Sequence, residues 1–208
     1  MRTRLELAAV TKAFGSNKVL NQAWLQVRSS EAVGLIGSNG AGKTTLLRIA
    51  AGLVLPDGGS VRWADERPSL RYFGGEMTLP PNVGVRRWAS LFDLHVDDRR
   101  RIGQLSRGNR QLLGLRVVLS GADADILLLD EPWEGLDPSG SVWLTETLRR
   151  WRASGAAILI SSHRFHDLDS VCTRFVMLEG GRCLPITAQD AQPRVEQLVQ
   201  AFARRGRM

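Results

Sequence analysis

Short apolar runs recur along this chain, separated by polar or glycine-rich segments. Ala32–Ile36 and Ile126–Leu129 contain only apolar residues and glycine, and Ala156–Ser161 is apolar up to its final serine. Runs this short predict strands of a parallel sheet that is buried on both faces. A further strand is expected at Leu70–Phe73. The pattern therefore predicts an α/β fold around a mostly parallel central sheet.

Apolar residues at helical spacing predict helices elsewhere in the chain. One helix follows residue 42, with apolar residues at positions 46, 47, 49 and 50, and another spans Gln111–Leu119. A third is expected in residues 82–92, where the apolar positions are Val83, Val85, Trp88 and Leu91. In the tail, residues 185–208, a last stripe falls at Val195, Leu198, Val199 and Phe202.

Composition limits the class of protein. The 208 residues fit one domain with a sizeable core, and 43% hydrophobic with 24% charged residues is typical of a soluble globular protein. No stretch approaches eighteen consecutive apolar residues, and the N-terminus interleaves charges with apolar residues, so neither a membrane span nor a secretory signal is expected. A cytoplasmic location is the resulting expectation.

The net charge of +7 suits nucleic acid or an anionic surface, but the arginines are scattered and no nucleic-acid-binding motif appears. Nucleic acid is therefore not expected as the main partner. Cys172 and Cys183 lack the spacing of a metal site, which favours idle thiols over ligands or a disulfide.

A glycine-rich segment directly follows the first apolar strand. It matches G-x-x-x-x-G-K-[ST] and consists of Gly37, Ser38, Asn39, Gly40, Ala41, Gly42, Lys43 and Thr44. Between a strand and a helix, this motif predicts a loop whose backbone N–H groups surround phosphates at a helix N-terminus. Lys43 would reach the β- and γ-phosphates, the Thr44 hydroxyl would bind Mg²⁺, and Thr45 would touch the α-phosphate. The alternative is a glycine-rich turn without a ligand.

Two adjacent carboxylates end the strand at Ile126–Leu129. Asp130 would hold Mg²⁺ through water, and Glu131 would polarise the water that attacks the γ-phosphate. An ordinary acidic turn is the alternative for this pair. A GTPase is disfavoured because no N/T-K-x-D motif occurs, and a small-molecule kinase because no arginine-rich lid is recognisable. His163 follows the strand at Ala156–Ser161, where the γ-phosphate is expected, although a lone histidine is more often a packing or surface residue.

These motifs, in this order, make the chain similar to the ATP-binding cassette family, the nucleotide-binding subunits of ABC transporters. The resemblance covers about residues 4–183 and implies a P-loop NTPase with an N-terminal antiparallel β subdomain and a short inserted α-helical subdomain. GSNGAGKTT resembles the family's Walker A motif and ILLLDE its Walker B motif, so Glu131 matches the catalytic glutamate and His163 the switch histidine. Asp137 resembles the D-loop aspartate. Phe14 matches the aromatic residue that stacks on adenine, with a core aromatic as the alternative.

The stretch QLSRGNRQ resembles the family's signature loop, usually LSGGQ. The matching positions are Leu105, Ser106, Arg107, Gly108 and Asn109. Arg107 replaces a glycine and Asn109 a glutamine. In the family this loop binds the γ-phosphate of ATP held by the other subunit, and here Ser106 could equally cap the helix that follows. Both interpretations use the same helix end.

Two features depart from the family pattern. The Q-loop glutamine has no clear match, and Glu76 is the candidate by position after the strand Leu70–Phe73. The helical and signature lobe, about residues 76–120, is short, which predicts a trimmed docking surface for a transport partner. The whole chain, residues 1–208, is expected to form one ABC ATPase domain with a short helical tail and no regulatory domain.

The resemblance implies an ATP-binding and ATP-hydrolysing subunit that requires Mg²⁺. It would act as a homodimer or heterodimer that sandwiches two ATP molecules, at the inner face of the cell membrane, and drive a separate membrane-spanning permease. Export of the ABC-2 or multidrug kind is expected. The alternatives are the haem-export ATPase of cytochrome c maturation, or a soluble ABC-type ATPase that acts on nucleic acid or ribosomes.

Overall fold

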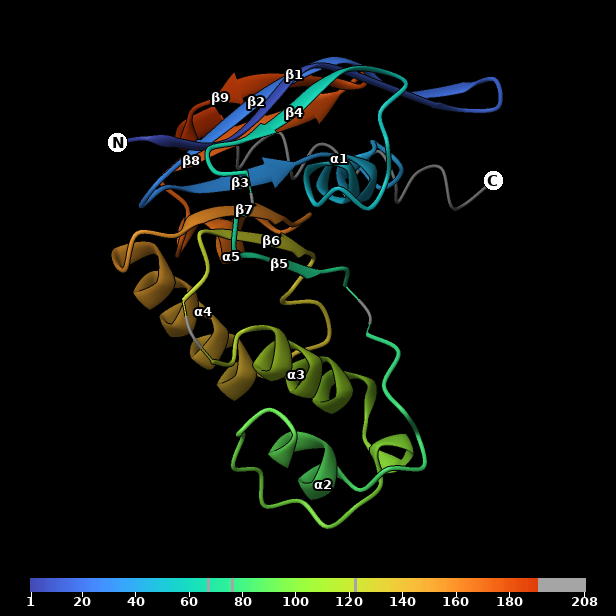
Figure 1. Cartoon of the computed structure of the whole chain (residues 1–208), viewed down its shortest axis with the longest axis vertical. Helices are drawn as coiled ribbons and strands as arrows, with labels where there is room; N and C mark the ends of the chain where they lie inside the picture. The colour runs from blue at the N-terminus through green and yellow to red at the C-terminus, as the bar shows by residue number, and fades with distance from the viewer. Residues whose placement is uncertain (67, 76, 122, 191–208) are drawn as a thin grey trace.

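The computed structural model describes residues 1–66, 68–75, 77–121 and 123–190, which form two sheets with helices around them (Figure 1). The first sheet is antiparallel, with strand order β2-β1-β4. Its strands are β1 (Thr3–Phe14), β2 (Asn17–Arg28) and β4 (Gly58–Trp63). This is the antiparallel N-terminal layer that the family resemblance implied.

The second sheet has six strands in the order β5-β6-β7-β3-β8-β9. Its strands are β3 (Ala32–Ile36), β5 (Leu70–Phe73), β6 (Ile126–Asp130), β7 (Ala157–Ser161), β8 (Arg174–Glu179) and β9 (Arg182–Ile186). The first five are parallel and only β9 is antiparallel, on β8. The strands β3, β6 and β7 are buried throughout, as their apolar runs predict. The mostly parallel sheet is therefore confirmed, with each predicted strand within a residue of its observed bounds.

Helices cover both faces of the parallel sheet (Figure 1). Helix α1 (Lys43–Ala50) lies between the two sheets, whereas α3 (Arg107–Val118) and α4 (Pro138–Ala153) lie on the opposite face with the short α5 (Phe165–Asp169). Alternate residues of a strand point to opposite faces. On β6, Leu127 and Leu129 accordingly pack with the α3 and α4 side, whereas Ile126 and Leu128 pack with α1. The same alternation directs Asp130 toward α1.

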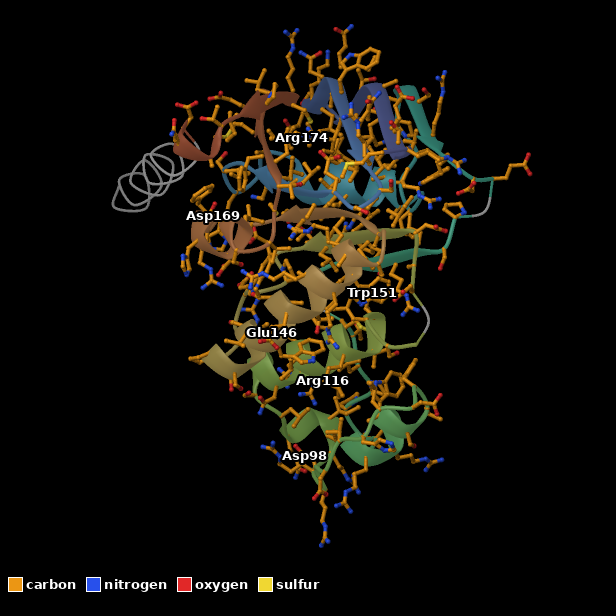
Figure 2. All side chains as sticks on the ribbon, turned by 90° about the vertical axis from the view of Figure 1, so that its left-hand side faces the viewer. Asp98, Arg116, Glu146, Trp151, Asp169 and Arg174 are labelled. Carbon is orange, nitrogen blue, oxygen red and sulfur yellow. The ribbon has the colours of Figure 1, made fainter. Side chains whose placement is uncertain are left out.

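A small helical lobe projects beyond α3 at one end of the molecule, where Asp98 is labelled in Figure 2. It contains α2 (Val85–Ser90) and the 3₁₀ turn η1 (Ile102–Gln104). Its own apolar cluster includes Val85, Ala89 and Leu113. The expected stripe is wrong at Leu91, which is 69% exposed, because α2 ends at Ser90 and Ala89 takes the inward position.

Two further expectations concern the signature helix and the C-terminal tail. The signature helix was expected to begin at Gln111, but α3 begins at Arg107, so its first turn contains the signature residues themselves. The predicted tail helix and Glu76 lie outside the described residues. Among the helices that the structure does describe, none has the length and apolarity needed to cross a membrane.

Candidate functional site

The site lies where β3, β6 and β7 end, at the same edge of the parallel sheet. These three strands are hydrogen-bonded neighbours, and Asp130 at the end of β6 is paired in register with Ser161 at the end of β7. Side chains that follow neighbouring parallel strands therefore meet here, although 30 or more residues separate them in sequence.

The glycine-rich loop connects β3 to α1. Gly42, at the helix N-cap, has φ 102°, which a residue with a side chain rarely adopts, and a Cβ there would lie 2.8 Å from Val19 Cγ1. Gly42 has no side chain that could cap this helix, so the first N–H groups of α1 can bind an anion. Lys43 is 7% exposed, and its Nζ donates to the carbonyl oxygens of Gly37 at 2.8 Å and Ser38 at 3.3 Å. The loop is thus wrapped around the lysine ammonium.

Hydroxyl and carboxylate oxygen atoms lie close together beside this loop. Thr44 Oγ1 donates to Asp130 Oδ2 at 2.6 Å, and Ser161 Oγ donates to Asp130 Oδ1 at 2.5 Å. Asp130 is 5% exposed and Ser161 is fully buried. Mg²⁺ prefers one or two carboxylates together with hydroxyl, water and phosphate oxygens. The Thr44 hydroxyl and Asp130 carboxylate supply donors of this kind, so the residues present fit the ion.

Glu131 reaches the same site from an unusual backbone conformation. Its φ of 46° lies in the left-handed region, which costs a residue other than glycine about 1–2 kcal/mol. The carboxylate accepts the backbone N–H of His163 at 3.2 Å, and the same oxygen lies 2.9 Å from His163 Nδ1. Its other oxygen lies 3.6 Å from Lys43 Nζ. Glu131 is therefore held between a phosphate-loop cation and the histidine.

The signature segment, residues 105–109, forms the start of α3. Ser106 caps the helix by accepting the Asn109 N–H at 3.2 Å, as the capping interpretation expected, and Leu105 is buried. Arg107 Nη2 lies 3.2 Å from Glu134 Oε1, an exposed ion pair. Gly108 sits so close to the next loop that a Cβ would lie 2.1 Å from the Gly135 carbonyl oxygen.

The Asp137 and Phe14 sites have distinct environments. Asp137 caps α4, and its Oδ1 accepts the Gly140 N–H at 2.7 Å.

Phe14 ends β1 with 53% of its surface exposed, which removes the core-aromatic alternative. Lys12 Nζ lies 5.6 Å from the Phe14 ring centroid and also hydrogen-bonds Asp57, which lowers the pKa of that carboxyl.

A cavity of about 230 Å³ opens beside the phosphate loop. Its walls come from Ser38 and Ala41 of the loop, from Asn17 at the start of β2, and from residues 177–181 at the β8–β9 turn. Asn17 is paired with Phe14 across the β1–β2 hairpin. Phe14 therefore lies beside Asn17, a residue of the cavity wall.

Sequence reasoning missed three residues that support this site. Ser161 holds Asp130 and also accepts the Glu131 N–H at 3.0 Å, and Gln111 Nε2 donates to the Glu131 carbonyl oxygen at 3.3 Å. Arg164 Nη2 donates to the Trp133 carbonyl at 3.1 Å, and its Nε lies 2.7 Å from Asp167 Oδ2. Burial nevertheless raises the pKa of Asp167 above its usual value. Of the three, only Ser161 had a signal in the sequence, as the polar residue that ends the apolar run Ala156–Ser161.

Comparison with known proteins agrees with the geometry. The family model described as ABC transporter matches residues 20–134, more than half of the chain. The Nod factor export ATP-binding protein I of Cupriavidus pinatubonensis is 32% identical over 209 residues, which cover 86% of this chain and 64% of the relative. The Hemin import ATP-binding protein HmuV of Pseudomonas putida is also 32% identical, over 92% of this chain and 93% of the relative.

A solved structure of the ATP binding subunit of an ABC transporter has the same fold. It matches with a TM-score of 0.76 at 23% identity, covering 96% of this chain and 99% of that chain. The two-sheet α/β fold of an ABC ATPase, with its short helical insertion, is thereby confirmed.

Proposed function

This chain belongs to the ABC transporter family, whose ATP-binding subunits hydrolyse ATP, and on that premise we propose that it is the ATPase subunit of an ABC exporter. The observation that carries the proposal is the position of Glu131. A carboxylate held between the phosphate-loop lysine and a strand-end histidine supports a role in orienting the water that attacks a γ-phosphate.

The phosphate loop would bind the triphosphate of ATP. Its backbone N–H groups, the uncapped start of α1 and Lys43 all favour negative charge, and Thr45 on the first turn would contact the α-phosphate. Incoming phosphate oxygens would accept the hydrogen bonds that Lys43 now makes to loop carbonyls. The adenine would stack on the exposed Phe14 ring, which also has Lys12 Nζ 5.6 Å from its centroid.

Thr44 and Asp130 would hold Mg²⁺, which in phosphoryl transfer neutralises developing phosphate charge. The Asp130 carboxylate is kept in orientation by the Ser161 hydroxyl. Glu131 would accept a hydrogen bond from the attacking water and orient it, as a general base or water-positioning group. His163 would fix the Glu131 carboxylate and stand at the γ-phosphate side.

The signature segment would complete the nucleotide site of a second subunit. Ser106 and Gly108 lie at the start of α3, where a helix N-terminus favours an anion. Two chains arranged head to tail, identical or related, would enclose two ATP molecules between phosphate loops and signature segments. ATP binding would close this dimer and hydrolysis would open it.

The motion would drive a separate membrane-spanning permease, with this subunit at the inner face of the membrane. The Nod factor export relatives support an exporter, and the chain spans 64% and 61% of the length of two of them. The hemin import relative supports an importer instead. Transport in vesicles that contain the subunit and its permease would separate the two directions: an exporter moves solute away from the side that holds ATP and this subunit, and an importer moves solute toward that side.

Substitution of Glu131 by Gln tests the proposed chemistry. Glu131→Gln keeps the size of the side chain but removes its negative charge, so hydrolysis should fall by about 10²–10⁴-fold, the usual contribution of acid–base catalysis. ATP should then hold a dimer that size-exclusion chromatography with light scattering detects. Wild-type turnover by the variant would refute the role of Glu131. Failure of the wild-type chain to hydrolyse ATP would refute the proposed function.

A further inference from the structure

Gln111 connects the signature helix directly to the backbone of Glu131. It lies on the second turn of α3, where its side chain is 6% exposed. Its Nε2 donates to the carbonyl oxygens of Glu131 at 3.3 Å and Pro132 at 3.2 Å. A buried amide with two carbonyl acceptors on consecutive residues fixes the peptide between them more firmly than a single bond would.

The backbone that Gln111 fixes is the strained one. Glu131 has φ 46°, and its N–H is held from the other side by the Ser161 carbonyl oxygen at 3.1 Å and the Ser161 hydroxyl at 3.0 Å. Pro132 has no N–H and contributes no donor of its own. A left-handed conformation at a residue other than glycine persists only when its surroundings impose it. Here β7 imposes it on one side of Glu131, and α3 on the other.

The first turn of α3 rests on the same loop. Gly108 packs against the Gly135 carbonyl with no room for a Cβ, and Arg107 pairs with Glu134. A shift of the signature segment therefore presses on the loop that begins at Glu131. Among the side chains of α3, Gln111 bonds directly to the carbonyl of the carboxylate residue, which also accepts the backbone N–H of Glu134 at 3.1 Å.

We propose that Gln111 is a positioning residue, which transmits contact between the signature segment and the partner subunit's nucleotide to Glu131 in its own nucleotide site. This inference rests on the proposed function. Without Gln111, the Pro132 carbonyl loses its side-chain donor and the Glu131 carbonyl keeps the Glu134 N–H, at 3.1 Å, so α3 no longer holds the Glu131 peptide in its left-handed conformation. The carboxylate then leaves its place between Lys43 and His163, although the phosphate loop is unchanged.

The first test is the ATPase kinetics of the full-length Gln111→Leu variant. Because misplacement of a reacting group by an ångström costs up to about 100-fold in rate, kcat should fall about 10- to 100-fold, whereas KM for ATP should stay within about twofold. Gln111→Met keeps the length of the side chain but has no N–H donor, and it should show the same split. It also serves if the leucine variant does not fold.

Leu113→Ala is the matched control. Leu113 is on the same helix and is 4% exposed, but it packs in the cluster of the helical lobe. It should lower the temperature of unfolding while kcat, measured well below that temperature, stays within about threefold of wild type, because no reacting group is misplaced. An equal fall in kcat for both variants would mean that Gln111 acts only through helix stability, and would overturn the proposal.

The second test uses the ATP-trapped dimer. In a Glu131→Gln background, addition of Gln111→Leu should leave the ATP-dependent dimer undiminished, because Gln111 acts on hydrolysis and not on nucleotide capture. Loss of the dimer in the double variant would assign Gln111 to the signature segment alone and overturn the proposal, as would wild-type kcat for Gln111→Leu. If the wild-type chain lacked ATPase activity, or Glu131→Gln formed no dimer, the proposed function itself would fail.

Discussion

A single methyl group at Gly108 tests how tightly the signature helix rests on the loop after Glu131. The Cβ of Gly108→Ala would lie 2.1 Å from the Gly135 carbonyl oxygen, whereas real Cβ atoms essentially never approach another atom within 3.0 Å. Rotation of a side chain cannot relieve this contact, because the Cβ is fixed by the backbone of α3 and the oxygen belongs to the backbone of the loop. The helix and the loop must therefore move apart, and the bonds of Gln111 to the same loop must lengthen.

The expected loss of stability is a balance of two effects. Overpacking of a tight contact costs about 1–3 kcal/mol. Alanine is favoured over glycine within a helix by about 1 kcal/mol, which offsets part of that cost. Because an approach of 2.1 Å is far inside contact distance, the cost lies in the upper part of that range, about 2–3 kcal/mol, and a net loss of about 1–2 kcal/mol remains. For a chain of this length that loss corresponds to a fall in Tm of roughly 2–8 °C. The assay is urea or thermal unfolding of the nucleotide-free chain, followed by tryptophan fluorescence.

Gly84→Ala is the matched control. Gly84 caps α2 with φ −67° and ψ 139°, which alanine adopts freely, and no atom lies within 4 Å of its added Cβ. The loss of a favourable cap residue and the stiffening of the unfolded chain oppose each other, so stability should change by less than about 0.5 kcal/mol. If Gly108→Ala unfolds with the wild-type midpoint, or both variants lose stability equally, the close approach of α3 to the loop is refuted.

One further variant and one chemical reaction test the burial of Ser161 and Cys183. Ser161→Ala removes the buried hydroxyl that donates to Asp130 and accepts the Glu131 N–H, so the free energy of unfolding should fall by about 1–3 kcal/mol. The control is Ser90→Ala at an exposed position, which should leave the free energy of unfolding unchanged in the same denaturation assay. Burial raises the pKa of the Cys183 thiol to about 12, and it raises the pKa of the Cys172 thiol as well. Because the thiolate is the reactive form, alkylation of Cys183 at pH 8 should be on the order of a thousandfold slower in the folded chain than in denaturant. Equal rates of alkylation would contradict the burial of Cys183.

The local elements of the site follow from short stretches of sequence. The apolar run Ala32–Ile36, the glycine loop and the helix after it are contiguous, so their identity and order already define a phosphate-binding loop. The run Ile126–Leu129 likewise ends in Asp130, and strand alternation alone directs that carboxylate to one face. The motif residues themselves were therefore predictable, including the serine cap of the signature helix.

The contacts that make those residues a site were decided by the tertiary structure. Glu131 meets His163, 32 residues away, because β6 and β7 are paired in a register that places Asp130 beside Ser161. The left-handed backbone of Glu131 also could not be predicted from the sequence, because a glutamate gives no sign of this conformation, whereas a glycine would. The bonds of Gln111 and the pairing of Arg107 with Glu134 depend on how α3 packs on the loop. Sequence patterns report local periodicity and order, whereas strand register and helix packing depend on the whole core.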